Sequence, residues 1–122
     1  MMDMIFDTHA HYDDKAFDEE REELVAKLPS AGVGRVVNVG STYQSCETCL
    51  ALADKYEHVY ATVGVHPSET EEMTEEKFEE LKKKCMHPKC VAVGEIGLDY
   101  YWPEPSAEIQ KLWFERQLEL AR

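Results

Sequence analysis

Four short apolar segments, each followed by a longer helical pattern, limit this chain to very few folds. The apolar segments lie at about 4–8, 33–39, 59–65 and 91–96, and the helical patterns lie at about 14–30, 43–56, 74–85 and 106–122. The apolar segments are rich in valine and bounded by glycine, which is typical of strands buried on both faces of a parallel sheet. Strands and helices that alternate in this way predict an α/β fold with right-handed crossovers.

Residues suited to begin and end helices support the same pattern. Thr74 and Ser106 precede helical patterns and have side chains that accept hydrogen bonds from backbone amides, so we expect them to cap the third and fourth helices. The first helix is expected to stop before Pro29 and Gly32, which are both stop signals.

Two histidines with the same orientation follow the first predicted strand. His9 and His11 are two residues apart, and side chains on a strand alternate between its faces, so both imidazoles point the same way. Two imidazoles that leave one strand on one side can bind a single divalent ion. Asp7 has the same parity one step deeper, where it either orients a ligand or closes the strand.

Polar residues at the ends of two other strands are expected to lie near this histidine pair. Glu95 shares the parity of Val91 and Val93, so a core filled by the valines would place its carboxylate at the rim, within reach of the same ion. His66 follows the third strand and precedes Pro67, which ends that strand. Since chemistry gathers at the carboxyl ends of parallel strands, we expect these side chains at one end of the sheet.

Four stretches of the sequence carry a family resemblance. They are F-D-T-H-A-H-Y-D-D (6–14), V-G-V-H-P (63–67), V-G-E-I-G-L-D-Y-Y (93–101) and Q-K-L-W-F-E-R-Q-L-E-L-A (110–121). In their order and approximate spacing they resemble the signatures of TatD-type metal-dependent deoxyribonucleases. The resemblance implies a (β/α)8 TIM-barrel fold within the wider amidohydrolase-like group. A complete barrel needs ~250 residues, so residues 1–122 are expected to form the N-terminal half, with only the first four β-α units.

The resemblance also implies a metal site. It makes His9, His11 and Glu95 metal ligands, and it makes Glu95 a catalytic residue that bridges two ions. The implied cofactors are divalent metal ions (Mg, Mn or Zn), up to two per complete site, which would stabilise the attacking and leaving oxygens of a phosphodiester. The alternative role for Glu95 is a structural salt bridge.

Three residues are predicted to bind substrate: His66, Asp99 and Tyr100. In the resemblance His66 lies in the site as a phosphate contact or as a group that supports a ligand, and the alternative is a loop role without chemistry. Asp99 and Tyr100 belong to the loop after the fourth strand. The aromatic residues of this loop (100–102) either stack a nucleobase or plug the mouth of the barrel.

The net charge of −12 limits how the chain can bind DNA. Affinity for duplex phosphate needs clusters of Lys and Arg, so we do not expect a protein that coats duplex DNA. Surface charges are largely screened beyond ~8 Å, so a local metal site can still accept a strand end. The expected partner is DNA, single-stranded or at its ends. No stretch approaches the ~20 apolar residues of a membrane span, and a cytoplasmic location is expected.

The four cysteines are expected to be free thiols, as in most cytosolic proteins. Cys46 and Cys49 are three residues apart on the apolar stripe of a helix, which favours core packing over a metal or redox motif. Cys85, His87 and Cys90 resemble a loose zinc cluster, but they precede a strand and so belong to the end of the sheet opposite the predicted chemistry.

An open sheet of four strands leaves two unpaired edges and one apolar face bare. In the resemblance, two histidines and an aspartate on later strands complete the metal site, so this chain is expected to supply only part of it. We therefore expect it to associate either with a second copy, as a homodimer, or with a missing C-terminal half of the barrel.

Three functions agree with these features. The first is metal-dependent phosphodiester hydrolysis by a TatD-type deoxyribonuclease of the 3′-end exonuclease class. The second is a catalytically incomplete half-barrel that binds metal and self-associates. The third is an amide or deaminating hydrolase of the wider group, in which H-x-H also follows the first strand. Glu95 and its context G-E-I-G-L-D-Y-Y favour the phosphodiester branch.

Overall fold

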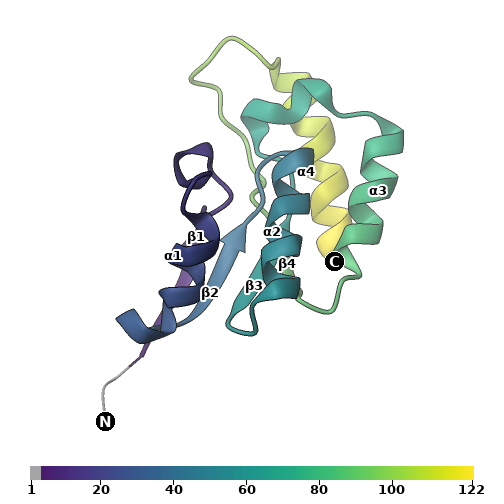
Figure 1. Ribbon diagram of the computed structural model, residues 1–122. Helices are drawn as coiled ribbons and strands as arrows, with labels where there is room; N and C mark the ends of the chain where they lie inside the picture. Colours follow the sequence, from purple (N-terminus) through teal and green to yellow (C-terminus); the bar gives the residue numbers. More distant parts are fainter. Residues whose placement is uncertain (1–3) are drawn as a thin grey trace.

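One parallel sheet with its strands in sequence order, β1-β2-β3-β4, forms the centre of the structure (Figure 1). The structure is a computed structural model that describes residues 4–122. The strands are β1 (Ile5–Ala10), β2 (Val33–Val39), β3 (Val59–Val63) and β4 (Cys90–Val93). Every neighbouring pair is parallel, so the predicted strand order and direction are confirmed.

Four α-helices and three 3-10 turns connect and follow the strands. They are η1 (Lys15–Phe17), α1 (Arg21–Lys27), η2 (Pro29–Ala31), α2 (Tyr43–Lys55), η3 (Pro67–Glu72), α3 (Glu75–Cys85) and α4 (Ala107–Ala121). Thr74 and Ser106 accept amide hydrogen bonds at the starts of α3 and α4, as predicted. No helix among residues 4–122 is long and apolar enough to cross a membrane.

The prediction of one long first helix over 14–30 was wrong, because α1 covers only seven residues. The Asp14 side chain accepts a hydrogen bond from the Ala16 amide and starts the separate 3-10 turn η1. At the other end, Pro29 begins η2, and Gly32 then takes the left-handed conformation, with φ of 97°. Local side-chain capping and the proline therefore divide a segment whose apolar spacing alone indicated a continuous helix.

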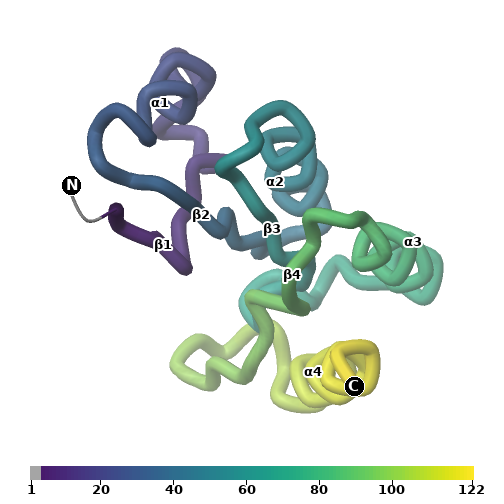
Figure 2. Tube along the Cα trace, turned by 90° about the horizontal axis from the view of Figure 1, so that it is seen from below, coloured from purple at the N-terminus to yellow at the C-terminus, as the bar shows by residue number. Residues whose placement is uncertain are grey.

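The helices lie along one side of the curved sheet, as the end-on view in Figure 2 shows. The main core fills the space between this side of the sheet and the helices. It includes buried side chains of β2, β3, α2 and α3, namely Val36, Val59, Ala61, Val63, Cys46, Leu52, Phe78 and Leu81. Cys46 and Cys49 are both fully buried, which confirms their predicted core packing.

The outer strands do not follow the expectation that all strands are buried on both faces. Ile5 and Phe6 in β1 are 59% and 56% exposed, and Val91 in β4 is 54% exposed. Val91 therefore fills no core in this chain. The exposed apolar residues lie on the edge strands β1 and β4, whereas Val36, Val37 and Val39 of the central strand β2 are at most 7% exposed, so the expected bare apolar face is limited to the two edges. The physical reason is that an edge strand has a neighbouring strand on one side only.

Candidate metal centre

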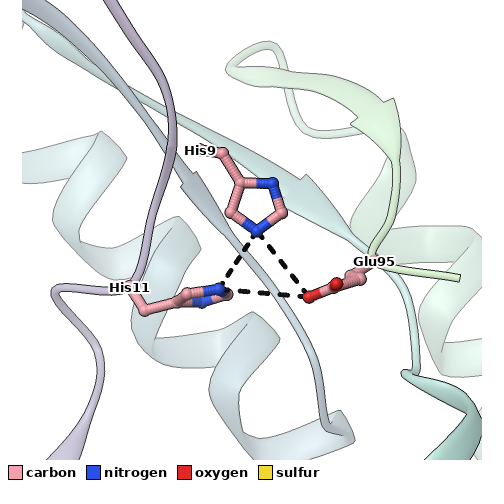
Figure 3. A group of neighbouring side chains, drawn as sticks. All are labelled: His9, His11 and Glu95. Atoms are coloured by element: carbon pink, nitrogen blue, oxygen red, sulfur yellow. Dashed lines mark hydrogen bonds and ion pairs between the residues drawn. The ribbon is translucent and has the colours of Figure 1, made fainter.

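His9 and His11 converge at the carboxyl end of β1, with their Nε2 atoms 3.1 Å apart (Figure 3). The rings meet edge to face, with centroids 5.0 Å apart. β1 continues through Ala10, so His9 lies on the strand and His11 lies directly after it. The two imidazoles thus leave the strand on the same side.

The orientation of His11 is set by the end of β2. Its Nδ1 lies 3.1 Å from the carbonyl oxygen of Val39. Because a carbonyl oxygen can only accept, Nδ1 carries the hydrogen and donates it. The neutral ring then keeps a lone pair on Nε2, which is the atom that faces His9. A histidine held in this way is prepared to ligate a metal through Nε2.

Asp7 acts on the backbone of the strand end. Its Oδ1 accepts a hydrogen bond from the His9 amide at 3.1 Å. The register of β1 against β2 also shifts between Asp7 and Ala10. Of the two roles left open by the sequence, this contact supports the one in which Asp7 shapes the end of the strand.

Glu95 brings a carboxylate to the two histidines from the other edge of the sheet. Its Oε2 lies 3.8 Å from Nε2 of His9 and 3.9 Å from Nε2 of His11. A tetrahedral ion with bonds of about 2.0–2.1 Å holds its ligand atoms roughly 3.3 Å apart. The three atoms therefore have nearly the spacing that one ion requires. Among residues 4–122, this is the only group of three or more His, Cys, Asp or Glu side chains so arranged.

The backbone beneath Glu95 is anchored to the ends of β2 and β3. β4 ends at Val93, earlier than the predicted 91–96, so Glu95 reaches the site from the segment after the strand. The Glu95 amide donates to the carbonyl of Gly40 at 2.7 Å, and the Thr62 hydroxyl donates to the carbonyl of Gly94 at 2.7 Å. A Cβ on Gly64 would lie 2.6 Å from the carbonyl carbon of Gly94, so glycine permits this close approach.

A cleft of about 310 Å³ opens beside these ligand atoms. It is lined by His11, Asp13, Asp14, Ser41, His66, Ser68, Glu69 and Glu95. The predicted site residues His11, His66 and Glu95 thus lie at one end of the sheet, as expected. Asp99 and Tyr100 do not line this cleft; they lie on the loop between β4 and α4.

His66 has the opposite hydrogen arrangement to His11. Its Nδ1 accepts a hydrogen bond from the Ser68 amide at 3.1 Å, and the Ser68 hydroxyl lies 2.8 Å from the same atom. An Nδ1 that accepts from an amide carries no hydrogen, so the neutral ring carries its hydrogen on Nε2. His66 is therefore prepared to donate a hydrogen bond through Nε2, whereas His11 is prepared to bind a cation.

Three buried polar residues near these loops were not predicted from the sequence. Asp13 lines the cleft, where burial of its side chain raises the pKa of its carboxyl group, while hydrogen bonds and the nearby His11 lower it. Gln110 and Gln117 of α4 are each about 1% exposed. Glutamine on a helix is usually exposed, so the available signals were the position of Asp13 inside the 6–14 motif and the two glutamines of the 110–121 motif.

The loose cluster of Cys85, His87 and Cys90 does not form a metal group among the described residues. His87 instead contacts Asp54, with Nε2 2.8 Å from Oδ1. The four cysteines are free.

The arrangement of parallel β-α units is shared with a known class of metal-dependent hydrolases. Residues 6–122 match the family described as TatD related DNase, and the chain belongs to this family. The chain is 37% identical over 119 residues to a protein of Bacillus subtilis named uncharacterized metal-dependent hydrolase YabD, covering 98% of this chain and 47% of the relative. It is 31% identical to a protein of Cronobacter sakazakii named 3'-5' ssDNA/RNA exonuclease TatD, covering 96% of this chain and 44% of the relative.

Solved structures place the fold in the same group. The crystal structure of YjjV, a TatD homolog from Escherichia coli K12, matches with a TM-score of 0.85 and 34% identity, covering 96% of this chain and 46% of that chain. A Saccharomyces cerevisiae protein described as an uncharacterized amidohydrolase shares the fold, with a TM-score of 0.84 at 22% identity. The chain spans about half the length of the curated relatives it matches. Its strands and helices are the first four β-α units of a TIM barrel.

Proposed function

We propose that this chain supplies the first part of the metal site in a phosphodiester hydrolase that removes nucleotides from DNA ends. The observation that carries the proposal is the convergence of His9, His11 and Glu95 within 3.1–3.9 Å at the carboxyl end of the sheet. The exonuclease name of the Cronobacter relative supports this reaction class. Residues 1–122 then form one domain, the N-terminal half of the barrel.

Each residue has a distinct role in this proposal. His9 and His11 hold a divalent ion through Nε2, and the Glu95 carboxylate shares that ion and a second one. When bound, the ions would lower the pKa of water and neutralise charge on phosphate oxygens. His66 donates its Nε2 hydrogen to a phosphate oxygen of the substrate. Its Nδ1 is held by Ser68, so the donor is fixed before substrate binds.

The substrate class follows from charge and from the loop after β4. A net charge of −12 gives no general attraction to duplex phosphate. Stacking needs no cation, and Tyr100 is 53% exposed, so it is available to stack on an unpaired base. The Asp99 side chain accepts from the Tyr101 amide at 3.1 Å and keeps this loop in shape. We therefore propose single strands or strand ends as substrate, in the cytoplasm.

Metal binding by the 122-residue chain tests the site. Glu95→Gln removes the ligand charge, and Glu69→Gln makes the same change on the rim of the same cleft. Titration with Co²⁺, followed by its visible absorbance, should show at least about 10-fold weaker binding for Glu95→Gln, because a ligand to the ion is altered. Glu69→Gln should bind like the wild type. His58 lies just before β3, with its Nε2 2.8 Å from the Val25 carbonyl, and it does not line the cleft. His9→Ala and His11→Ala should therefore weaken binding far more than His58→Gln. Equal binding by all variants would contradict the proposal.

Cleavage of a single-stranded oligonucleotide tests the reaction. We expect the chain alone to be at least about 100-fold slower than a full-length relative, because a partial ligand set holds the ion weakly. Strong activity that disappears in Glu95→Gln would show that a homodimer completes the site. Activity that is unchanged in Glu95→Gln would contradict the proposed role of Glu95, and cleavage of amides alone would favour the wider amidohydrolase group.

A further inference from the structure

A buried carboxylate lies behind His11, on the side of the ring away from the candidate ion. The Asp13 side chain is only 8% exposed, and its Oδ1 is 4.0 Å from Nδ1 of His11. This oxygen is buried and has no hydrogen-bond partner. Leaving a buried carboxylate oxygen without a partner costs free energy. A buried carboxylate that does not stabilise the fold through a hydrogen bond is a candidate for a functional role.

The backbone around Asp13 is fixed from two sides. The buried side chain of Asn38 accepts a hydrogen bond from the Tyr12 amide at 2.7 Å. The Arg21 guanidinium donates to the carbonyl oxygens of Tyr12 at 2.6 Å, Asp13 at 3.0 Å and Asp14 at 2.9 Å. These contacts hold the segment that follows His11 in one conformation. The position of the carboxylate is therefore imposed by the fold rather than by its own contacts.

Buried polar groups lie next to this segment. The Asn38 side chain, which accepts from the Tyr12 amide, also donates to the sulfur of the buried Cys49 at 3.3 Å. The unpartnered oxygen of Asp13 faces His11. Because the pair is shielded from water on the Asp13 side, solvent screens the charge less than at the surface.

We propose that Asp13 is a positioning residue that holds His11 in the form that ligates metal through Nε2. The Nδ1 hydrogen of His11 donates to the Val39 carbonyl at 3.1 Å, and the carboxylate stabilises the same hydrogen from 4.0 Å. The Val39 carbonyl fixes the tautomer, and the nearby negative charge makes the ring a stronger ligand. The attraction increases when the ring gains positive character on binding an ion. This inference rests on the metal site of the proposed function.

Asp13→Asn is the direct test, because it removes the charge and keeps the shape of the side chain. Its matched control is Asp14→Asn, which makes the same change in the next residue of the same cleft. Asparagine at position 14 can still cap η1. In a Co²⁺ titration we expect Asp13→Asn to bind 10–100-fold more weakly and Asp14→Asn to bind like the wild type.

The stability of the metal-free chain separates positioning from a merely structural role. Asp13→Asn removes a buried charge with an unpartnered oxygen, so thermal unfolding should occur at the same or a higher temperature. Asp13→Asn should therefore lower the affinity for metal without lowering the thermal stability of the metal-free chain. Asp13→Asn that binds Co²⁺ as the wild type does, or that fails to fold, would overturn the inference and leave the proposed function standing. A wild-type chain that binds no Co²⁺ would overturn both.

Discussion

Gln117 holds the backbone of Val65 at both its amide and its carbonyl group. The Val65 amide donates to Oε1 at 2.7 Å, and Nε2 donates back to the Val65 carbonyl at 3.3 Å. Since Val65 directly precedes His66, a buried side chain of α4 fixes the loop that carries this histidine. Gln110, on the same helix, makes an equivalent pair of hydrogen bonds. The Asp99 amide donates to its Oε1 at 2.8 Å, and its Nε2 donates to the Asp99 carbonyl at 2.9 Å.

We expect Gln117→Leu to lower the free energy of unfolding by about 1–3 kcal/mol, because the Val65 amide and carbonyl would lose their buried partners. The control is Gln44→Leu, at an exposed position of α2. Urea denaturation followed by circular dichroism measures both. A Gln117→Leu variant that unfolds at the same urea concentration as the wild type would show that the two hydrogen bonds of Gln117 do not stabilise the loop.

Lys89 should stabilise the fold by capping α2. Its Nζ donates to the carbonyl oxygens of Ala53 at 2.9 Å, Tyr56 at 2.9 Å and Glu57 at 3.1 Å. The last carbonyls of a helix lack partners within it, and a cation there is favourable. Lys89→Met should cost about 1.5–3 kcal/mol, the range for hydrogen bonds to charged groups. Lys83→Met, which removes an exposed pair with Glu80, should cost at most about 1 kcal/mol.

Cys90 should react with iodoacetamide near neutral pH. The neighbouring Cys85 thiol hydrogen-bonds to it and lowers the pKa of Cys90 from 9.0 to about 7. The thiolate is the reactive form, so the rate should rise as the pH increases through about 7. Burial raises the pKa of Cys46 to about 11, and that thiol should react slowly.

Cys85→Ala is the informative variant for this pH dependence. Loss of the hydrogen bond should move the midpoint of the Cys90 rate profile upward, toward the ordinary value of 9.0. Mass spectrometry of alkylated peptides assigns the rate to Cys90. A midpoint that stays in place in Cys85→Ala would show that another group stabilises the thiolate.

The exposed apolar residues of the two edge strands should cause self-association of the chain. Ile5, Phe6 and Val91 are each more than half exposed on β1 and β4. Burying ~500 Å² of such surface at roughly 25 cal/mol per Å² gives on the order of 12 kcal/mol before the costs of association. Light scattering should therefore report a dimer or larger species. Phe6→Lys should shift it toward the monomer, whereas a wild-type monomer of 14.0 kDa would contradict the expectation.

The alternation of strands and helices was sufficient to predict the sheet, because parallel β-α units permit few topologies. The shared parity of His9 and His11 also predicted that both rings leave the strand on the same side. The sequence could not predict how Glu95 reaches them, since β4 ends at Val93 and the approach depends on long-range contacts such as the Gly40 carbonyl. The burial of Gln110 and Gln117 was not predicted. Their buried amide groups are satisfied by hydrogen bonds to backbone groups that are distant in the sequence and come close only in the folded chain.

Two substitutions of His66 distinguish the roles of its two ring nitrogen atoms. Asparagine places a polar atom near the position of Nδ1, and glutamine places one near Nε2. His66→Asn should keep the contact with the Ser68 amide and the cap of η3, but it should lose the donor proposed to bind phosphate. His66→Gln should keep that donor.

A hydrogen bond to a charged group contributes about 1.5–3 kcal/mol, so His66→Asn should bind a single-stranded oligonucleotide roughly 10–100-fold more weakly than His66→Gln in the presence of Mg²⁺. Fluorescence anisotropy measures this ratio. Equal affinities would show that Nε2 of His66 does not contact the substrate, and weaker binding by His66→Gln would assign the contact to Nδ1.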